Sequence, residues 1–322
     1  MKYSKIQGVD KPVSRIFYGT ATMPFFEGGD EHELFDAMYG LGITAYDTAR
    51  NYQLSEKSLG NWIDLRGNRE KIVVLSKCGH PADDGRKRIN EKEMRADLAQ
   101  SLEYLKTDYI DIYLLHRDDP EMPVGTIVEI LNAIHAEGKI RAFGGSNWTY
   151  RRIEEANEYA YKKNLLPFTV SSPNYGLADQ VRDPWGGGCV SVSGPANQDA
   201  RDWYTKNQMP VIAFSSLGRG MFSGKVRSTD KNRVDKILDE FAVKGYVSDD
   251  NFERLRRCEI LAGEKKKTVS QIAMAYLFTG LMNTFAIVST RSPERMRTNI
   301  EALDIELTEK ERAWLDLRRD SL

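Results

Sequence analysis

Eight short apolar segments recur along the chain, and longer amphipathic stretches separate them. The segments are rich in Val, Ile, Leu and Phe, and they lack the polar–apolar alternation of a strand with one exposed face. This pattern predicts strands buried on both faces of a parallel sheet. The expected strands cover residues 16–19, 44–47, 72–76, 110–115, 140–144, 168–172, 211–215 and 284–288.

The stretches between these segments predict helices. Met94, Leu98, Leu102 and Leu105 recur at spacings of four, four and three, which places them on one apolar face of a helix. Two sites carry signals for a helix start. Ser55 is followed by an acid in the first turn, and Ser292 is followed by proline and then an acid.

Strand–helix repeats in this number predict an α/β fold, a (β/α)8 TIM barrel that forms a single domain over residues 1–322. Such a barrel typically needs about 250 residues, so the chain is long enough. An open, doubly wound sheet is the alternative. The strand count favours the barrel, as does the absence of a Gly-x-Gly-x-x-Gly turn after the first strand, which also removes the usual dinucleotide fingerprint.

Two stretches interrupt the repeat, at residues 177–197 and 225–267. The first contains Asp-Pro-Trp, three consecutive glycines and Ser-Gly-Pro, and the second is charged with weak helical patterning. Long loops that follow barrel strands usually build the active site. We therefore expect these two loops to cover the barrel mouth and to set substrate specificity.

The charge balance argues against a polyanionic partner. Basic residues number 46 and acidic residues 47, for a net charge of -1, so neither nucleic acid nor an anionic membrane is expected to bind. The N-terminus lacks a long apolar run, which predicts a cytoplasmic protein without a signal peptide. The three cysteines are expected to be free thiols, and the four histidines show no metal-ligand spacing, so no metal is expected.

Polar residues follow three neighbouring predicted strands. Asp47, Lys77 and His116 lie where these strands end, and Tyr52 comes five residues after Asp47. Strand ends converge on one mouth of a barrel, so we expect the four side chains to meet there. Packing alone does not explain four such groups at one place.

These residue types suit proton transfer to a carbonyl oxygen. A tyrosine with its usual pKa of about 10 is a weak acid at neutral pH, and the ammonium of Lys77 is expected to lower it. Asp47 would keep the lysine charged, and His116 would donate a hydrogen bond to the substrate carbonyl. Protein side chains do not supply hydride, so a nicotinamide cofactor is expected.

Several motifs then follow in order along the chain. They are Asp47-Thr48-Ala49-x-x-Tyr52, Ser55-Glu56-x-x-Leu59-Gly60, Leu114-Leu115-His116, Gly144-Gly145-Ser146-Asn147-Trp148, Ala213-Phe214-Ser215-Ser216-Leu217-Gly218-Arg219-Gly220 and Ser292-Pro293-Glu294-Arg295-x-x-x-Asn299. This set resembles the signature of the aldo-keto reductase family, and the resemblance runs from about Thr20 to Asn299.

The resemblance implies a catalytic tetrad of Asp47, Tyr52, Lys77 and His116, together with a set of cofactor contacts. Some of these contacts would hold the nicotinamide carboxamide, and one aromatic ring would stack on the nicotinamide. Others would line the pyrophosphate. Further contacts would lie at the adenosine end. The expected cofactor-binding residues are Thr20, Ser146, Asn147, Ser172, Phe214, Ser215, Leu217, Gly218, Arg219, Ser289, Thr290, Arg291, Arg295 and Asn299.

Ser172 and Ser289 are among the positions that depart from the family pattern. Ser172 stands where many members have a glutamine, which weakens the expected carboxamide contact. Ser289 stands where the best-known members have a lysine that helps to bind the 2′-phosphate. Ser289, Thr290 and Arg295 could still hold this phosphate, because an arginine makes bidentate contacts. NADP is therefore the expected cofactor, with NAD as the alternative.

Aromatic side chains are the expected substrate contacts. Phe25, Phe26, Trp148 and Trp185 could form an apolar wall, although Trp185 could instead pack its own loop. His80 is more readily explained as a loop histidine than as a pocket residue. Residues 86–88, Arg-Lys-Arg, are expected to form a solvated turn, and Arg219 faces either a cofactor phosphate or solvent.

These observations predict an enzyme that reduces an aldehyde or ketone to an alcohol, with Tyr52 as proton donor. The polar, glycine-rich loop is compatible with a sugar or another hydroxylated carbonyl compound. A Schiff-base aldolase is an alternative for Lys77 alone, but the expected Asp47 partner would keep that lysine charged. A second alternative is a non-catalytic, cofactor-sensing subunit that resembles the β subunits of potassium channels.

Overall fold

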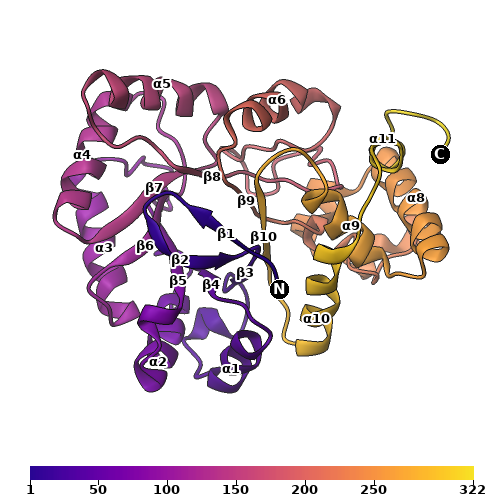
Figure 1. The fold of residues 1–322 in the computed structure, drawn as a ribbon, viewed down its shortest axis with the longest axis horizontal. Helices are drawn as coiled ribbons and strands as arrows, with labels where there is room; N and C mark the ends of the chain where they lie inside the picture. Colours follow the sequence, from indigo (N-terminus) through magenta and orange to yellow (C-terminus); the bar gives the residue numbers. More distant parts are fainter. The chain divides into compact units, whose positions relative to one another are not determined.

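The computed structural model describes all residues, 1–322 (Figure 1). Its parallel strands form a closed barrel. The strand order is β10-β3-β4-β5-β6-β7-β8-β9. This confirms the predicted (β/α)8 class, and each expected strand is present to within a few residues. The barrel strands are β3 (Ile16–Gly19), β4 (Ala45–Asp47), β5 (Val73–Cys78), β6 (Ile110–Leu115), β7 (Ile140–Ser146), β8 (Val170–Ser172), β9 (Val211–Ala213) and β10 (Thr284–Val288).

Residue contacts gather into two compact units. One covers Lys2–Ser172, and the other covers Pro173–Leu322 with Met1. The single domain expected over the whole chain stays a prediction. Short 3-10 helices occur in both units, at Phe25–Glu27, Arg69–Lys71, Pro195–Asn197, Gly218–Gly220, Lys231–Lys236 and Ala302–Asp304.

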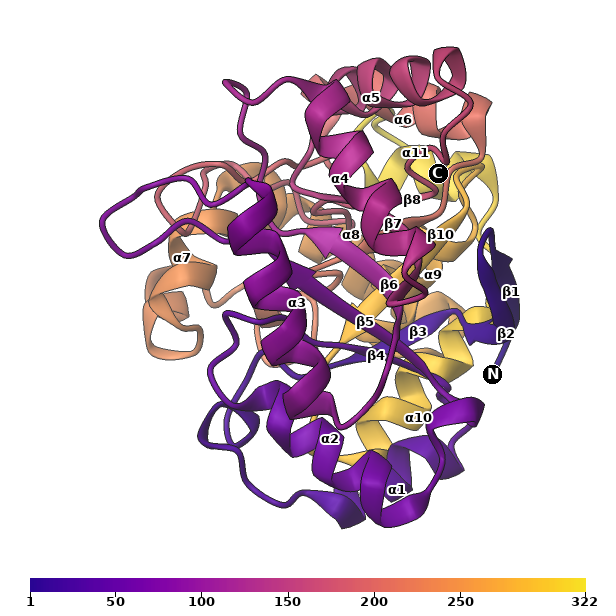
Figure 2. The same ribbon diagram turned by 90° about the vertical axis from the view of Figure 1, so that its left-hand side faces the viewer.

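The first unit contains β3 to β8 and five helices. These are α1 (His32–Gly40), α2 (Ser55–Arg66), α3 (Glu91–Leu105), α4 (Val124–Ala136) and α5 (Tyr150–Lys162). Figure 2 shows α3 and α4 lying over β5, β6 and β7. The side chain of Asn90 caps α3 by accepting from the backbone N–H of Glu93, and Met94 and Leu98 lie on its buried face. The predicted amphipathic helix is thereby confirmed.

Glycine allows a close approach of backbone between two of these strands. A Cβ on Gly144 of β7 would collide with the carbonyl oxygen of Val170, its partner in β8. Only glycine leaves room for that carbonyl. The same glycine belongs to the motif that leads to Ser146 and Asn147, so this contact helps to fix the end of β7.

A β-hairpin that the sequence analysis missed precedes the barrel. Its strands β1 (Tyr3–Ile6) and β2 (Val9–Ser14) pair antiparallel. Lys11 of the hairpin pairs with Asp111 at the start of β6, at 2.9 Å. The side-chain oxygen of Ser14 accepts from the backbone N–H of Ala45, which begins β4. The hairpin therefore covers N-terminal strand ends, opposite the ends that carry Asp47 and Lys77.

The second unit contains β9, β10 and the remaining helices. These are α6 (Gln198–Asn207), α7 (Glu240–Tyr246), α8 (Asp249–Lys265), α9 (Val269–Phe278), α10 (Pro293–Glu301) and α11 (Glu309–Leu315). Ser292 caps α10 by accepting from the backbone N–H of Arg295, which confirms the predicted start. Much of residues 225–267, expected as a loop, is helical in α7 and α8, because caps at Asp239 and Ser248 stabilise segments whose apolar pattern is weak.

No helix in the chain is both long enough and apolar enough to cross a lipid bilayer.

Candidate active site

The four side chains of the predicted tetrad lie close together in the first unit. Nζ of Lys77 lies 2.5 Å from Oδ1 of Asp47 and 3.3 Å from the hydroxyl oxygen of Tyr52. It also donates to the backbone carbonyl of Thr48, at 2.9 Å. The ring of His116 lies edge-on to the Tyr52 ring, with 5.5 Å between ring centres. The predicted tetrad residues are thus neighbours in the structure.

Backbone hydrogen bonds continue beyond the strand ends and hold these residues in place. The N–H of Thr48 donates to the carbonyl of Leu75, and the N–H of Arg50 donates to the carbonyl of Lys77. The N–H of His116 donates to the carbonyl of Cys78, at 2.8 Å. The barrel ladder therefore sets the positions from which the tetrad side chains project.

The Lys77–Asp47 ion pair is buried, with each side chain about 3% exposed. Burial alone would lower the pKa of Lys77, but the Asp47 carboxylate and the Tyr52 hydroxyl together raise it above its usual value. The lysine therefore keeps its charge at neutral pH. A neutral Schiff-base lysine does not fit this environment.

Tyr52 keeps its proton in the resting enzyme. Burial raises the pKa of Tyr52 above its usual value, and the Lys77 ammonium only partly offsets this effect. The expectation of a lowered pKa was wrong, because it counted the charge of Lys77 and left out the loss of water. The hydroxyl is then a donor whose ionised form Lys77 can stabilise once an acceptor takes the proton.

His116 is neutral and has an unpartnered nitrogen. Burial lowers its pKa well below the usual value, and the positive charges of Lys77 and Arg117 lower it further. Its Nδ1 is buried and has no hydrogen-bond partner in the protein. Buried polar atoms nearly always have a partner, so this nitrogen fits a bound polar group.

The end of β7 carries buried polar groups next to His116. Asn147 adopts a left-handed backbone conformation, φ 59°, and its amide donates to the carbonyl of His116 at 3.2 Å. Ser146 donates to the carbonyl of Ser172 at 2.9 Å. Thr20, also buried, donates to the carbonyl of Asp47 at 3.0 Å. These expected nicotinamide contacts all lie at the C-terminal ends of strands of the first unit.

In the second unit, Phe214 is half-buried and follows β9 directly. The ring of Trp185, in the loop expected to cover the barrel mouth, lies 6.1 Å from the Phe214 ring between centres. The guanidinium of Arg219 lies 5.5 Å from the Trp185 ring centre and pairs with Asp239 at 3.1 Å. Arg219 is thus held by protein groups, and its expected contact with a cofactor phosphate stays a prediction.

The segment after β9 turns sharply. Ser215 has φ 51°, and the consecutive residues Gly218, Arg219 and Gly220 have φ values of 57°, 49° and 103°. The N–H groups of Gly218 and Gly220 donate to the carbonyls of Ser215 and Leu217 within these turns. The pyrophosphate contacts expected at Ser215, Leu217 and Gly218 stay a prediction.

A helix N-terminus follows β10 and carries the residues expected at the adenosine end. Ser289, Arg291 and Arg295 are exposed, Thr290 is half-buried, and Asn299 is buried. Backbone N–H groups in the first turn of a helix favour a phosphate, and arginine adds a bidentate donor. The residues of the second unit therefore fit the phosphate-bearing part of a nicotinamide dinucleotide.

Two of the expected substrate contacts belong to the packed interior. Phe25 is fully buried beside the rings of Tyr18 and Phe35, and Trp148 is fully buried against Phe168. Neither side chain forms an exposed wall, which corrects the prediction. Trp185 is 39% exposed.

Phe26 is the aromatic residue beside the tetrad. It is half-buried, and its ring centre lies 6.4 Å from that of Tyr52. Sequence alone could not separate it from its neighbour Phe25, since both lie in one short helical turn.

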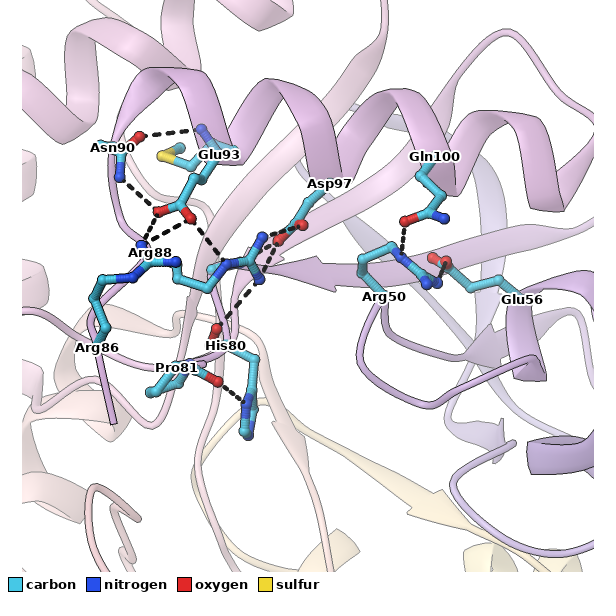
Figure 3. Close-up of polar contacts among 12 residues, drawn as sticks. Arg50, Glu56, His80, Pro81, Arg86, Arg88, Asn90, Glu93, Asp97 and Gln100 are labelled. Atoms are coloured by element: carbon cyan, nitrogen blue, oxygen red, sulfur yellow. Dashed lines mark hydrogen bonds and ion pairs between the residues drawn. The ribbon is translucent and has the colours of Figure 1, made fainter. Parts of the chain in front are cut away.

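His80 and Arg88 are nearer to the site than the sequence analysis indicated. The His80 ring lies edge-on to the His116 ring, with 5.0 Å between centres. Arg88 pairs with Asp97 at 2.7 Å and with Glu93 at 3.2 Å, so it is not part of a solvated turn (Figure 3). The one sequence signal for His80 was its location two residues after β5, the strand that carries Lys77.

Comparison with known proteins decides the family. The model of the aldo/keto reductase family matches residues 15–317. The chain belongs to the aldo/keto reductase family. An aryl-alcohol dehydrogenase [NADP(+)] of Phanerodontia chrysosporium is 28% identical, over 93% of this chain and 77% of the relative. Norsolorinic acid reductase B of Dothistroma septosporum is also 28% identical, over 86% of this chain and 69% of the relative.

A bacterial relative covers more of its own length. The uncharacterized oxidoreductase YrpG of Bacillus subtilis is 28% identical, over 95% of this chain and 92% of the relative. As an aldo/keto reductase, the chain is an oxidoreductase for carbonyl compounds that uses a nicotinamide cofactor. These enzyme relatives do not favour the alternative of a non-catalytic subunit.

Proposed function

We propose that Tyr52 donates the proton in the reduction of a carbonyl compound to an alcohol. The observation that carries this proposal is the position of the Lys77 ammonium, within 3.3 Å of the Tyr52 hydroxyl and 2.5 Å of Asp47. The tyrosine is protonated at rest, and a cation stands next to the oxygen that becomes charged when the proton leaves.

Each tetrad residue has a separate task in this proposal. A bound nicotinamide supplies hydride to the carbonyl carbon. As negative charge develops on the carbonyl oxygen, the Tyr52 hydroxyl transfers its proton to that oxygen, and Lys77 stabilises the phenolate. Asp47 keeps Lys77 charged and oriented. The neutral His116 ring donates its N–H to the same carbonyl oxygen and holds the carbonyl in line.

Replacement of Tyr52 by phenylalanine tests the assignment. Tyr52→Phe should bind the cofactor normally, because the ring and its contacts with Phe26 and His116 remain. Carbonyl-dependent NADPH oxidation should fall about 10²–10⁴-fold, the usual contribution of a general acid. Tyr161→Phe, at an exposed position, is the matched control. Full activity in Tyr52→Phe would refute its role, and cofactor binding without turnover in the unaltered protein would favour a sensor.

We further propose that the cofactor is NADP(H), with NAD(H) as the alternative. Arg295 supports this, since it is an exposed cation in the first turn of α10, where a 2′-phosphate can also accept from backbone N–H groups. A relative whose name specifies NADP(+) gives further support.

The coenzyme proposal has a matched pair of variants on one helix. Arg295→Ala should weaken NADPH binding about tenfold or more while NADH binding changes little, because only NADPH carries the extra phosphate. Arg297→Ala, an exposed arginine of the same helix, is the control. Cofactor fluorescence titration gives both dissociation constants. Equal losses for NADPH and NADH would contradict a phosphate contact.

Aromatic aldehydes and ketones are the substrate class we propose first. The half-buried Phe26 ring beside Tyr52 offers an apolar face for an aryl group. Relatives named aryl-alcohol dehydrogenase point to the same class. A screen of NADPH oxidation with benzaldehydes, acetophenones, aldoses and short aliphatic aldehydes would rank these classes. We also propose a cytoplasmic location, in keeping with three free cysteines.

A further inference from the structure

We propose that His80 is a substrate-binding residue that accepts a hydrogen bond from a hydroxyl group on the carbon next to the carbonyl. The preferred substrates are then α-hydroxy ketones and α-hydroxy aldehydes, including aryl ones. This inference rests on the proposed function of the tetrad, and it adds a second polar contact for the substrate beside His116.

His80 lies next to the residue that would hold the carbonyl oxygen. Its ring is half-buried, edge-on to the His116 ring at 77°, with 5.0 Å between ring centres. Two imidazoles at this separation can contact two polar atoms on neighbouring carbons of one substrate. The Tyr52 ring also lies next to His116, with 5.5 Å between their ring centres.

A network of ion pairs anchors the backbone of His80. Arg88 donates to the His80 carbonyl at 3.4 Å and pairs with Asp97 at 2.7 Å. The same Asp97 carboxylate accepts from the N–H of Gly79, at 3.0 Å. Figure 3 shows this network between α3 and the loop, with the His80 ring on the side away from α3. These contacts fix the backbone from which the His80 side chain projects.

The hydrogen bond at Nδ1 decides what the ring can offer a ligand. Nδ1 lies 2.9 Å from the carbonyl oxygen of Pro81, which can only accept, so Nδ1 carries the proton. Burial lowers the pKa of His80, and the charges of Arg117 and Arg88 lower it further, so the ring is neutral at pH 7. In a neutral imidazole with its proton on Nδ1, Nε2 is an acceptor. Its natural partner is a hydroxyl donor.

A pair of ketones of nearly equal shape tests the inference. α-Hydroxyacetophenone and propiophenone differ only in a hydroxyl that replaces a methyl group. His80→Phe keeps an aromatic ring against His116 and removes the acceptor. It should lower kcat/KM for α-hydroxyacetophenone about tenfold more than for propiophenone, as expected for the loss of one hydrogen bond. His80→Gln, which keeps an acceptor oxygen, should lose less.

Binding can be measured apart from turnover. In a Tyr52→Phe background with NADPH bound, quenching of cofactor fluorescence should show weaker α-hydroxyacetophenone binding after His80→Phe. His135→Phe is the matched control, since His135 is a half-buried histidine of α4 whose ring contacts Phe143.

Each outcome separates the two proposals. Equal losses on both ketones, or no loss on either, would overturn the role of His80 as an acceptor and leave it a packing residue. Reduction of benzaldehyde without a preference between the ketones in the unaltered protein would also overturn it. Absence of turnover with any carbonyl, benzaldehyde included, would instead mean that the proposed function has failed.

Discussion

Removal of the charge on Lys77 gives the sharpest test of the site. Lys77→Met keeps most of the side-chain length but leaves the Asp47 carboxylate buried without its ion-pair partner, which lies 2.5 Å away in the native site. Breaking a buried ion pair on one side costs about 3–5 kcal/mol of unfolding free energy. Asp47→Asn should cost less, because Lys77 retains the Thr48 carbonyl at 2.9 Å.

The double variant Asp47→Asn/Lys77→Met removes both charges together. Its loss of unfolding free energy should be smaller than the sum of the losses in the two single variants by about 2 kcal/mol. The reason is that residues in direct contact couple by about 0.5–3 kcal/mol. All three variants should lose most carbonyl reduction, because none leaves Tyr52 beside an ammonium held by a carboxylate. Stability and activity are thus expected to separate in the double variant.

Urea unfolding followed by circular dichroism measures these free energies, and NADPH oxidation measures activity. Lys77→Met should also recover part of its stability as pH falls. Burial raises the pKa of Asp47 in the folded protein above that in the unfolded chain. Lowering the pH therefore protonates the buried carboxylate and removes its unpaired charge, which increases the free energy of unfolding. The reasoning would be refuted if Lys77→Met cost under about 1 kcal/mol, or if the losses in the double variant simply added.

Two further predictions concern stability. His116 has a folded pKa well below its usual 6.5, so the unfolded chain binds a proton that the fold does not, and unfolding free energy should fall as pH drops below 6.5. His116→Asn should reduce this slope by up to about 1.4 kcal/mol per pH unit in urea titrations, and an unchanged slope would contradict the buried neutral ring. Gly144→Ala should cost about 3 kcal/mol, because its Cβ meets the Val170 carbonyl, whereas Gly263→Ala on α8, with open space around it, should gain about 0.5–1 kcal/mol. Melting temperatures that shift alike in these two glycine variants would contradict the packing argument.

Much of the fold was predictable because the barrel strands are continuous apolar runs. Because β6 is buried on both faces, its sequence, Ile110–Leu115, is mainly apolar and lacks polar–apolar alternation. The hairpin of β1 and β2 was missed since its short strands mix charged and apolar residues. The helices α7 and α8 were underestimated because their start depends on capping at Asp239 and Ser248 more than on apolar periodicity.

The sequence by itself determined the barrel class and the family resemblance, and it predicted the four tetrad residues. These depend on residue type and order along the chain, which a linear pattern records. Contacts between distant segments do not leave such a record. For that reason the same role was expected of Phe25 and Phe26, whereas in the structure Phe25 packs in the interior and Phe26 lies beside Tyr52.

Only the tertiary structure decided the protonation of the site. Sequence reasoning paired Tyr52 with Lys77 and expected a lowered pKa, but burial outweighed that charge and raised it. The same packing brought His80 within 5.0 Å of His116 between ring centres and fixed its tautomer through Pro81. Desolvation and hydrogen bonding depend on every neighbour in three dimensions, so no local pattern in the sequence could supply them.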